Sequence, residues 1–175
     1  VSENELTLDV VAQLKKVFGV EVKDLISNVD NSQIYLNDEG ISDLGLEKNK
    51  VINEIIKILK SFDFISNAYS SDYIMNAKAL DGYEKLIQNG FHEKRSGDIA
   101  LILEPNVIFY DGKGTTHGSG YNYDTHVPLI FFGSGVKNGE TERITEIPDI
   151  APTISKLLGQ KMKNSTGESL DFIFD

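Results

Sequence analysis

The chain has 175 residues, with 40% hydrophobic and 25% charged side chains, a formal net charge of −10 at pH 7 and no cysteine. This length can bury one sizeable core, so we expect a single domain over residues 1–175. The acidic balance argues against a nucleic-acid-binding surface. The lack of cysteine excludes disulfides and thiolate metal sites, and no apolar run approaches the roughly 20 residues of a membrane span.

The first predicted element is an amphipathic helix over Thr7–Phe18, whose apolar stripe begins at Leu8. Thr7 is its predicted N-cap, and Gly19 lies where a helix commonly ends in a left-handed residue. Two short strands, 26–29 and 33–36, are then predicted around a polar turn. The chain therefore opens with a helix followed by a hairpin.

The middle of the chain contains both the spacing of apolar residues that is typical of helices and the spacing that is typical of strands. A second amphipathic helix is predicted over 47–62, followed by a strand at 64–69. A short helical turn at 70–75 and a helix at 83–88 come next, and the apolar run at 98–104 is typical of a buried strand. Each of these segments is short enough for one layer of a compact fold.

The last part of the chain contributes three predicted elements. Residues 107–110 are expected to return antiparallel to the preceding strand, and 127–132 form a second apolar segment typical of a buried strand. A helix over 148–158 is expected to begin through Asp149. Strict strand–helix alternation is absent, so the pattern indicates an α/β class in the broad sense, a mixed α+β sheet covered by helices.

The loop before residue 127 contains two of the three histidines, His117 and His126, among glycines and hydroxyl side chains. Small neighbours such as Gly118 expose the imidazole of His117, which suits a metal ligand or an acid–base group. Asp124 offers two interpretations: it orients an imidazole, or it accepts hydrogen bonds from the amides of the turn. A structural zinc site needs four protein ligands and a catalytic one three, so three histidines without cysteine argue against a zinc site made by this chain alone.

The motif T-H-G-S-x-Y-x-Y-D-x-x-V-P-x-I-F, from Thr116 to Phe131, and the helix start I-P-D-I-A-P-T, from Ile147 to Thr153, closely resemble the C-terminal part of the alkaline phosphatase superfamily. The resemblance extends over residues 95–172 and is greatest to phosphate-irrepressible alkaline phosphatases and nucleotide pyrophosphatase/phosphodiesterases. It implies hydrolysis of phosphate esters at a two-zinc site with a Thr or Ser nucleophile, in an exported, periplasmic or secreted enzyme. It also implies an alkaline phosphatase-like fold.

The same resemblance implies roles for particular residues. His117 corresponds to a zinc ligand of the family and His126 is the second choice, while Thr116, Gly118 and Asp124 form the supporting loop. The nucleophile, the early Asp ligand, the Asp-x-x-x-His pair and the Asp-His pair of the family are all missing. We therefore assign no catalytic residue and expect a C-terminal fragment, beginning at Val1 without Met, that binds zinc weakly or not at all alone.

The expected partners follow from this interpretation. They are the N-terminal part of the same polypeptide, called the parent enzyme below, and a phosphate-ester substrate of that parent enzyme. Two alternatives stay open. One is a fragment of a sulfatase or phosphoglycerate mutase relative, to which the motif is less similar. The other is a standalone, non-catalytic binding module that has the same fold.

Overall fold

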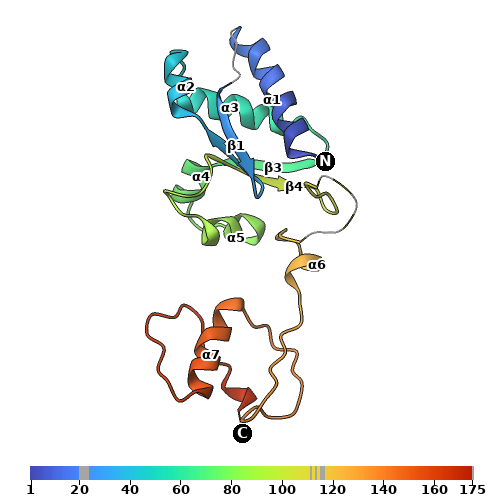
Figure 1. The fold of residues 1–175 in the computed structure, drawn as a ribbon, viewed down its shortest axis with the longest axis vertical. Coiled ribbons are helices and arrows are strands. Elements are labelled where there is room, and N and C mark those ends of the chain that lie inside the picture. The colour runs from blue at the N-terminus through green and yellow to red at the C-terminus, as the bar shows by residue number, and fades with distance from the viewer. Residues whose placement is uncertain (20–23, 111, 113, 115–116, 175) are drawn as a thin grey trace. The chain divides into compact units, whose positions relative to one another are not determined.

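The structure is a computed structural model that describes residues 1–19, 24–110, 112, 114 and 117–174. Its internal contacts divide the chain into two compact units, Val1–His126 and Val127–Asp175, which are described separately here (Figure 1). The expected single domain over 1–175 stays a prediction.

The first unit is built on a four-stranded antiparallel sheet with the order β1-β2-β4-β3. The strands are β1 (Ile26–Asp30), β2 (Gln33–Leu36), β3 (Ile65–Ser70) and β4 (Ile99–Leu103). The predicted hairpin and the strands predicted at 64–69 and 98–104 are confirmed, with ends that differ by one residue or so.

A tight turn joins β1 to β2 and also contacts β4. Asn31 and Ser32 both adopt positive φ angles, 49° and 57°, as a two-residue hairpin turn of the primed type requires. The carbonyl oxygen of Ser32 accepts a hydrogen bond of 2.8 Å from the N–H of Leu101 in β4. The turn therefore fixes both the hairpin and its attachment to the neighbouring strand.

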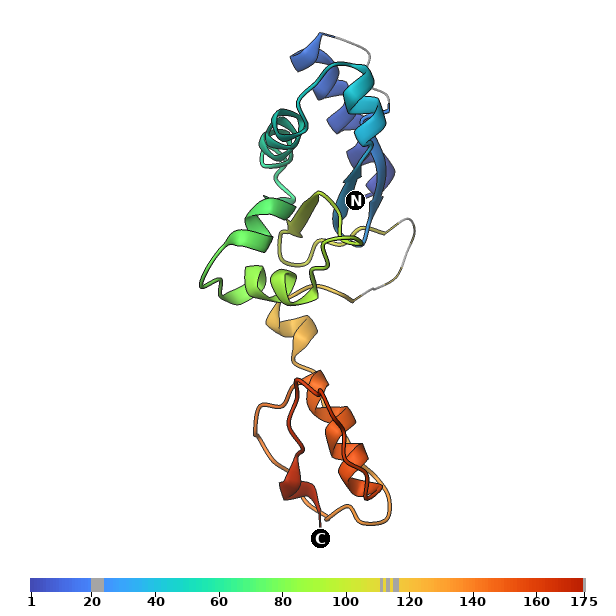
Figure 2. The ribbon, with the colours of Figure 1, turned by 90° about the vertical axis from the view of Figure 1, so that its left-hand side faces the viewer.

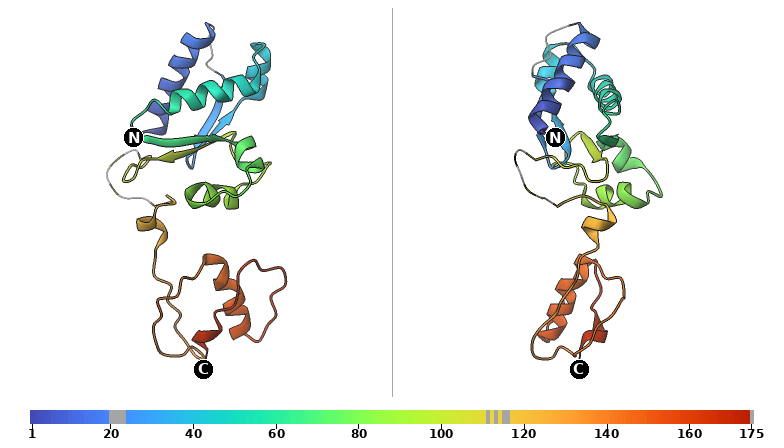
Figure 3. Two further views of the ribbon diagram at one scale, coloured as in Figure 1. Left: turned by 180° about the vertical axis from the view of Figure 1, so that it is seen from behind. Right: turned by 90° about the vertical axis from the view of Figure 1, so that its right-hand side faces the viewer.

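Helices α1 (Glu3–Phe18) and α3 (Lys48–Leu59) cover one face of this sheet (Figures 1 and 3). Their apolar stripes meet the sheet in a single core. Its fully buried members include Val10, Leu14, Val51, Ile55, Leu59, Ile34, Ile99 and Leu101. Burial of this one apolar layer is the main stabilising contribution available to the first unit.

Helix α1 begins four residues earlier than predicted, and its buried stripe begins at Leu6 rather than at Leu8. Leu6 is 2% exposed and lies on the stripe with Val10, whereas Leu8 is 69% exposed. Thr7 is not the N-cap: it lies within the helix, and its hydroxyl donates to the carbonyl of Glu3 at 2.8 Å. The C-cap prediction is confirmed, because Gly19 has φ 68° and its N–H donates to the carbonyl of Lys15.

The first unit also contains the shorter helices α2 (Asp38–Asp43), α4 (Ser71–Asn76) and α5 (Gly82–Gly90) and the four-residue helix α6 (Asn122–Thr125). Helices α4 and α5 lie on the side of the sheet opposite α1 and α3 (Figures 1 and 2), so helices cover both faces. The helices predicted at 70–75 and 83–88 are thus confirmed. Helix α2 was not predicted, although Asn37 gives a local signal by accepting the N–H of Gly40 with its side chain. The expected mixed class is confirmed.

The strand predicted at 107–110 is wrong. Residues 107–110 do not pair with β4, which pairs with β3 along Ile99–Leu103 on one edge and with β2 at Ile99 and Ala100 on the other. The chain instead turns at Asn106, which has φ 66°, and the N–H of Tyr110 donates to the carbonyl of Val1 at 3.0 Å.

The second unit contains the 3-10 helices η1 (Ile147–Asp149) and η2 (Asp171–Ile173) and the helix α7 (Ile150–Leu157). The helix predicted at 148–158 is confirmed, including its start at Asp149. The carboxylate of Asp149 accepts the N–H of Glu146 and the N–H of Glu168, each at 2.9 Å. The first bond closes the helix start, and the second ties it to the C-terminal segment.

The strand predicted at 127–132 is wrong. Ile130 and Phe132 are 81% and 100% exposed, and these residues pair with no strand in the described part of the second unit. The β-bridge present there joins Val136 to Phe174 instead. An apolar run forms a strand only where a neighbouring strand satisfies its backbone groups, and composition does not reveal whether that neighbour is present.

Across the described residues, no helix combines the length and apolarity needed to cross a membrane.

Candidate functional site

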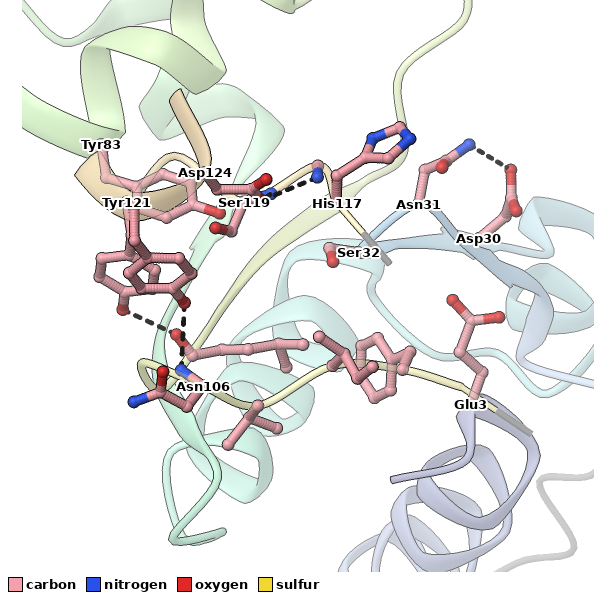
Figure 4. A pocket seen from close by; sticks show the side chains of 16 residues that line it. Glu3, Asp30, Asn31, Ser32, Tyr83, Asn106, His117, Ser119, Tyr121 and Asp124 are labelled. Atoms are coloured by element: carbon pink, nitrogen blue, oxygen red, sulfur yellow. Dashed lines mark hydrogen bonds between the residues drawn. The ribbon is translucent and has the colours of Figure 1, made fainter. Parts of the chain in front are cut away.

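A pocket of about 310 Å³ lies in the first unit, beside the loop that contains His117 (Figure 4). Residues from five parts of the sequence line it: the start of α1, the β1–β2 turn, α5, the segment after β4, and the loop at 117–124. The polar or aromatic lining residues are Glu3, Asp30, Asn31, Ser32, Tyr83, Asn106, Phe109, His117, Ser119, Tyr121, Tyr123 and Asp124. The sheet and its hairpin thus bring together residues that are far apart in the chain.

His117 is exposed, and its imidazole extends toward the side of the pocket where Asn31 lies (Figure 4). The residue that follows, Gly118, has φ 116°, a conformation that side-chain-bearing residues rarely adopt. This glycine lets the chain turn sharply after His117. The imidazole is therefore presented at the apex of a turn, where a ligand in the pocket can reach it.

Asp124 closes this turn. Its Oδ2 atom accepts hydrogen bonds from the N–H groups of Gly118, at 2.8 Å, and Ser119, at 2.6 Å. The bond from Ser119 is the largest cause that lowers the pKa of Asp124, with Gly118 and the nearby His117 acting in the same direction. Asp124 is consequently an ionised acceptor at neutral pH. Two roles were predicted for Asp124, and the geometry shows the second one: its carboxylate accepts hydrogen bonds from the amides of the turn.

Tyrosines attach the loop to the rest of the first unit. The hydroxyl of Tyr121 donates to the carbonyl of Leu103, at the end of β4, at 2.8 Å. The hydroxyl of Tyr123 accepts the N–H of Asn106 at 3.0 Å. The rings of Tyr121 and Tyr123 stack with centroids 5.7 Å apart, and Tyr83 meets Tyr121 edge to face at 5.2 Å. These rings were not among the predicted site residues, although Y-x-Y in the motif was a visible signal.

Of the other predicted site residues, Gly118 and Asp124 lie beside His117 and line the same pocket. His126 is the C-cap of α6 (Asn122–Thr125); it is exposed and does not line the pocket. Thr116 falls outside the described residues.

A metal site can be judged from the donors present. Imidazole and carboxylate are groups that zinc binds, and the pocket contains His117, Glu3 and Asp30. However, no three His, Cys, Asp or Glu residues within the described parts of the chain form a group that could hold a metal ion. His117 fits a single ligand position, and the described residues do not complete a site.

Comparisons with known proteins place the chain in a family, although no family model matches it. It is 40% identical over 158 residues to a protein of Myroides odoratus named calcium-transporting ATPase, covering 89% of this chain and 28% of that protein. It is 35% identical over 148 residues to alkaline phosphatase PafA of Elizabethkingia meningoseptica, covering 84% of this chain and 27% of PafA.

The crystal structure of wild-type alkaline phosphatase PafA matches with a TM-score of 0.88 and 31% identity, over 98% of this chain and 33% of that one. The chain thus spans about a quarter to a third of the length of these relatives. The fold class expected from the sequence is confirmed by this match. The chain belongs to the alkaline phosphatase superfamily and corresponds to a part of such a phosphatase-family protein.

Proposed function

We propose that this chain is the C-terminal part of a zinc-dependent phosphate-ester hydrolase, an alkaline phosphatase or a type I phosphodiesterase, and that it is inactive alone. The observation that supports this most is the T-H-G-S-x-Y-x-Y-D loop, which presents His117 to a pocket in a chain that matches PafA over 98% of its length. The nucleophile and the other metal ligands would come from the remainder of the parent enzyme.

In this proposal each residue of the loop has a defined task. His117 would provide one imidazole nitrogen to a zinc ion, with His126 as the second choice. Gly118 and Asp124 would maintain the turn that presents it, together with Thr116. A zinc ion bound there would stabilise negative charge on phosphate oxygens. The described residues include no nucleophile beside a set of metal ligands, which is why the chain alone is expected to be inactive.

The test compares the parent enzyme with the 175-residue chain. Both are assayed with zinc against p-nitrophenyl phosphate, bis(p-nitrophenyl) phosphate and ATP, the last because of the name of the Myroides relative. We expect turnover by the parent enzyme, loss of that turnover after treatment with a chelator, and none by the chain alone. Hydrolysis by the chain alone at rates near those of the parent enzyme would contradict the fragment proposal.

Substitutions in the parent enzyme identify the ligand. His117→Ala should reduce kcat/KM by at least about 100-fold, equivalent to roughly 2.7 kcal/mol, and should lower the bound zinc. His92→Ala is the matched control, because His92 lies at the surface, where its ring nitrogen accepts the N–H of Lys94 at 3.2 Å. Zinc loss in His126→Ala, with His117→Ala unaffected, would assign the ligand to residue 126 instead.

A further inference from the structure

We infer that Asp124 is a positioning residue for His117: its carboxylate fixes the turn that presents the imidazole, so metal binding at His117 depends on Asp124 although Asp124 is not a ligand. This inference rests on the proposed function only in taking His117 as the metal ligand. It concerns a set of hydrogen bonds that lies entirely within the first unit.

The bond to Gly118 acts directly on the conformation of His117. The Gly118 N–H belongs to the planar peptide unit that begins at the Cα atom of His117. Holding that N–H against Asp124 at 2.8 Å therefore fixes the ψ angle of His117. The second bond, from Ser119 at 2.6 Å, holds the next peptide unit against the same oxygen atom. Two consecutive peptide planes after His117 are thus fixed by one carboxylate.

Asp124 is in turn fixed to the sheet. Its own N–H donates to the carbonyl of Tyr121 at 2.8 Å. The hydroxyl of Tyr121 donates to Leu103 at the end of β4, and the neighbouring Tyr123 bonds to Asn106 in the segment that follows. A continuous series of contacts therefore runs from β4 through Asp124 to the peptide beside His117. Contacts of this kind hold the residues around a metal ligand in place and so restrain the orientation of the ligand itself.

The chain contains a matched control for a purely structural role. Asp149 also accepts two backbone N–H groups, from Glu146 and Glu168 at 2.9 Å each, and these bonds lower its pKa as well. It lies in the second unit, away from the His117 loop in sequence. Asp149→Asn weakens a comparable pair of charge-assisted bonds without touching the turn at His117.

The first experiment uses the 175-residue chain and needs no metal. Amide hydrogen exchange is measured by NMR in Asp124→Ala, Asp124→Asn and Asp149→Asn. We expect exchange at Gly118 and Ser119 to rise about tenfold in Asp124→Ala, because two charge-assisted bonds are lost, and to rise less in the isosteric Asn variant, which keeps an acceptor oxygen. Asp149→Asn should leave both amides unchanged.

The second experiment measures the zinc dissociation constant of the parent enzyme by competition with a chelator. The expected affinity loss is about 10- to 100-fold in Asp124→Ala, smaller in Asp124→Asn and absent in Asp149→Asn. Wild-type zinc affinity in Asp124→Ala, while His117→Ala loses the metal, would overturn the positioning role and leave the proposed function standing. Full zinc retention in both His117→Ala and His126→Ala would instead overturn the zinc-binding role that the proposed function gives to this loop. If Asp124→Ala fails to fold, the Asn variant decides between the same outcomes.

Discussion

A methyl group added at Gly120 is expected to displace the His117 loop from helix α5. An ideal Cβ at this position would lie 2.9 Å from two ring carbons of Tyr83 and 3.0 Å from a methyl carbon of Leu86. Ordinary contacts of this kind are 3.4–4 Å. The ring of Tyr83 is restrained by the edge-to-face contact with Tyr121, so the loop must move instead. Overpacking of this size costs about 1–3 kcal/mol.

Chemical denaturation of the Gly120→Ala chain and NMR of the His117 imidazole measure the two consequences. We expect the free energy of unfolding to fall by about 1–3 kcal/mol and the imidazole signals to shift. Gly90→Ala is the control, because a Cβ there meets nothing within 4 Å, and the change should be neutral or stabilising by about 0.5–1 kcal/mol. A Gly120→Ala chain within about 0.5 kcal/mol of wild type, with unchanged imidazole signals, would refute the reasoning.

Two further predictions concern the sheet. Gly97→Ala should destabilise the chain by at least about 2 kcal/mol, because the added Cβ would lie 2.7 Å from the backbone oxygen of Ile34 in β2. Urea denaturation measures this loss, and a midpoint equal to that of the wild type would contradict the packing. Burial, with a hydrogen bond from the Tyr69 hydroxyl to Glu84, raises the pKa of Tyr69 above its ordinary 10.0. The folded state therefore keeps this proton when the unfolded state has lost it, so stability should decline as the pH rises above 10. Denaturation at pH 9 and 11 should show a smaller decline in Tyr69→Phe.

Local signals in the sequence predicted most elements of the first unit. The hairpin at 26–36 was predictable because the polar turn between its strands adopts the positive φ angles that Asn favours. The first buried residue of α1 was not, because Leu6 and Leu8 are equally apolar and only packing on the sheet decides which is buried. The predictions at 107–110 and 127–132 were wrong for a related reason, because a segment forms a strand only where it pairs with a neighbouring strand.

The candidate site was predictable in its local part only. His117 and Asp124 are seven residues apart in one motif, so the sequence alone connected them. Other parts of the pocket wall come from Asn31 and Ser32 in the hairpin turn and from Tyr83 in α5. These residues lack a motif of their own, and only the folding of the sheet and of α5 brings them to the loop.

The turn closed by Asp124 involves contacts of short range along the chain, since its two hydrogen bonds span five and six residues. Loops of about ten residues close within roughly 10–100 ns, far faster than distant segments of a protein meet. The conformational entropy of this turn is therefore lost during folding of the chain itself. A zinc ion bound at His117, as proposed, would therefore meet a preorganised imidazole, and its affinity would not be reduced by the cost of ordering a loose loop.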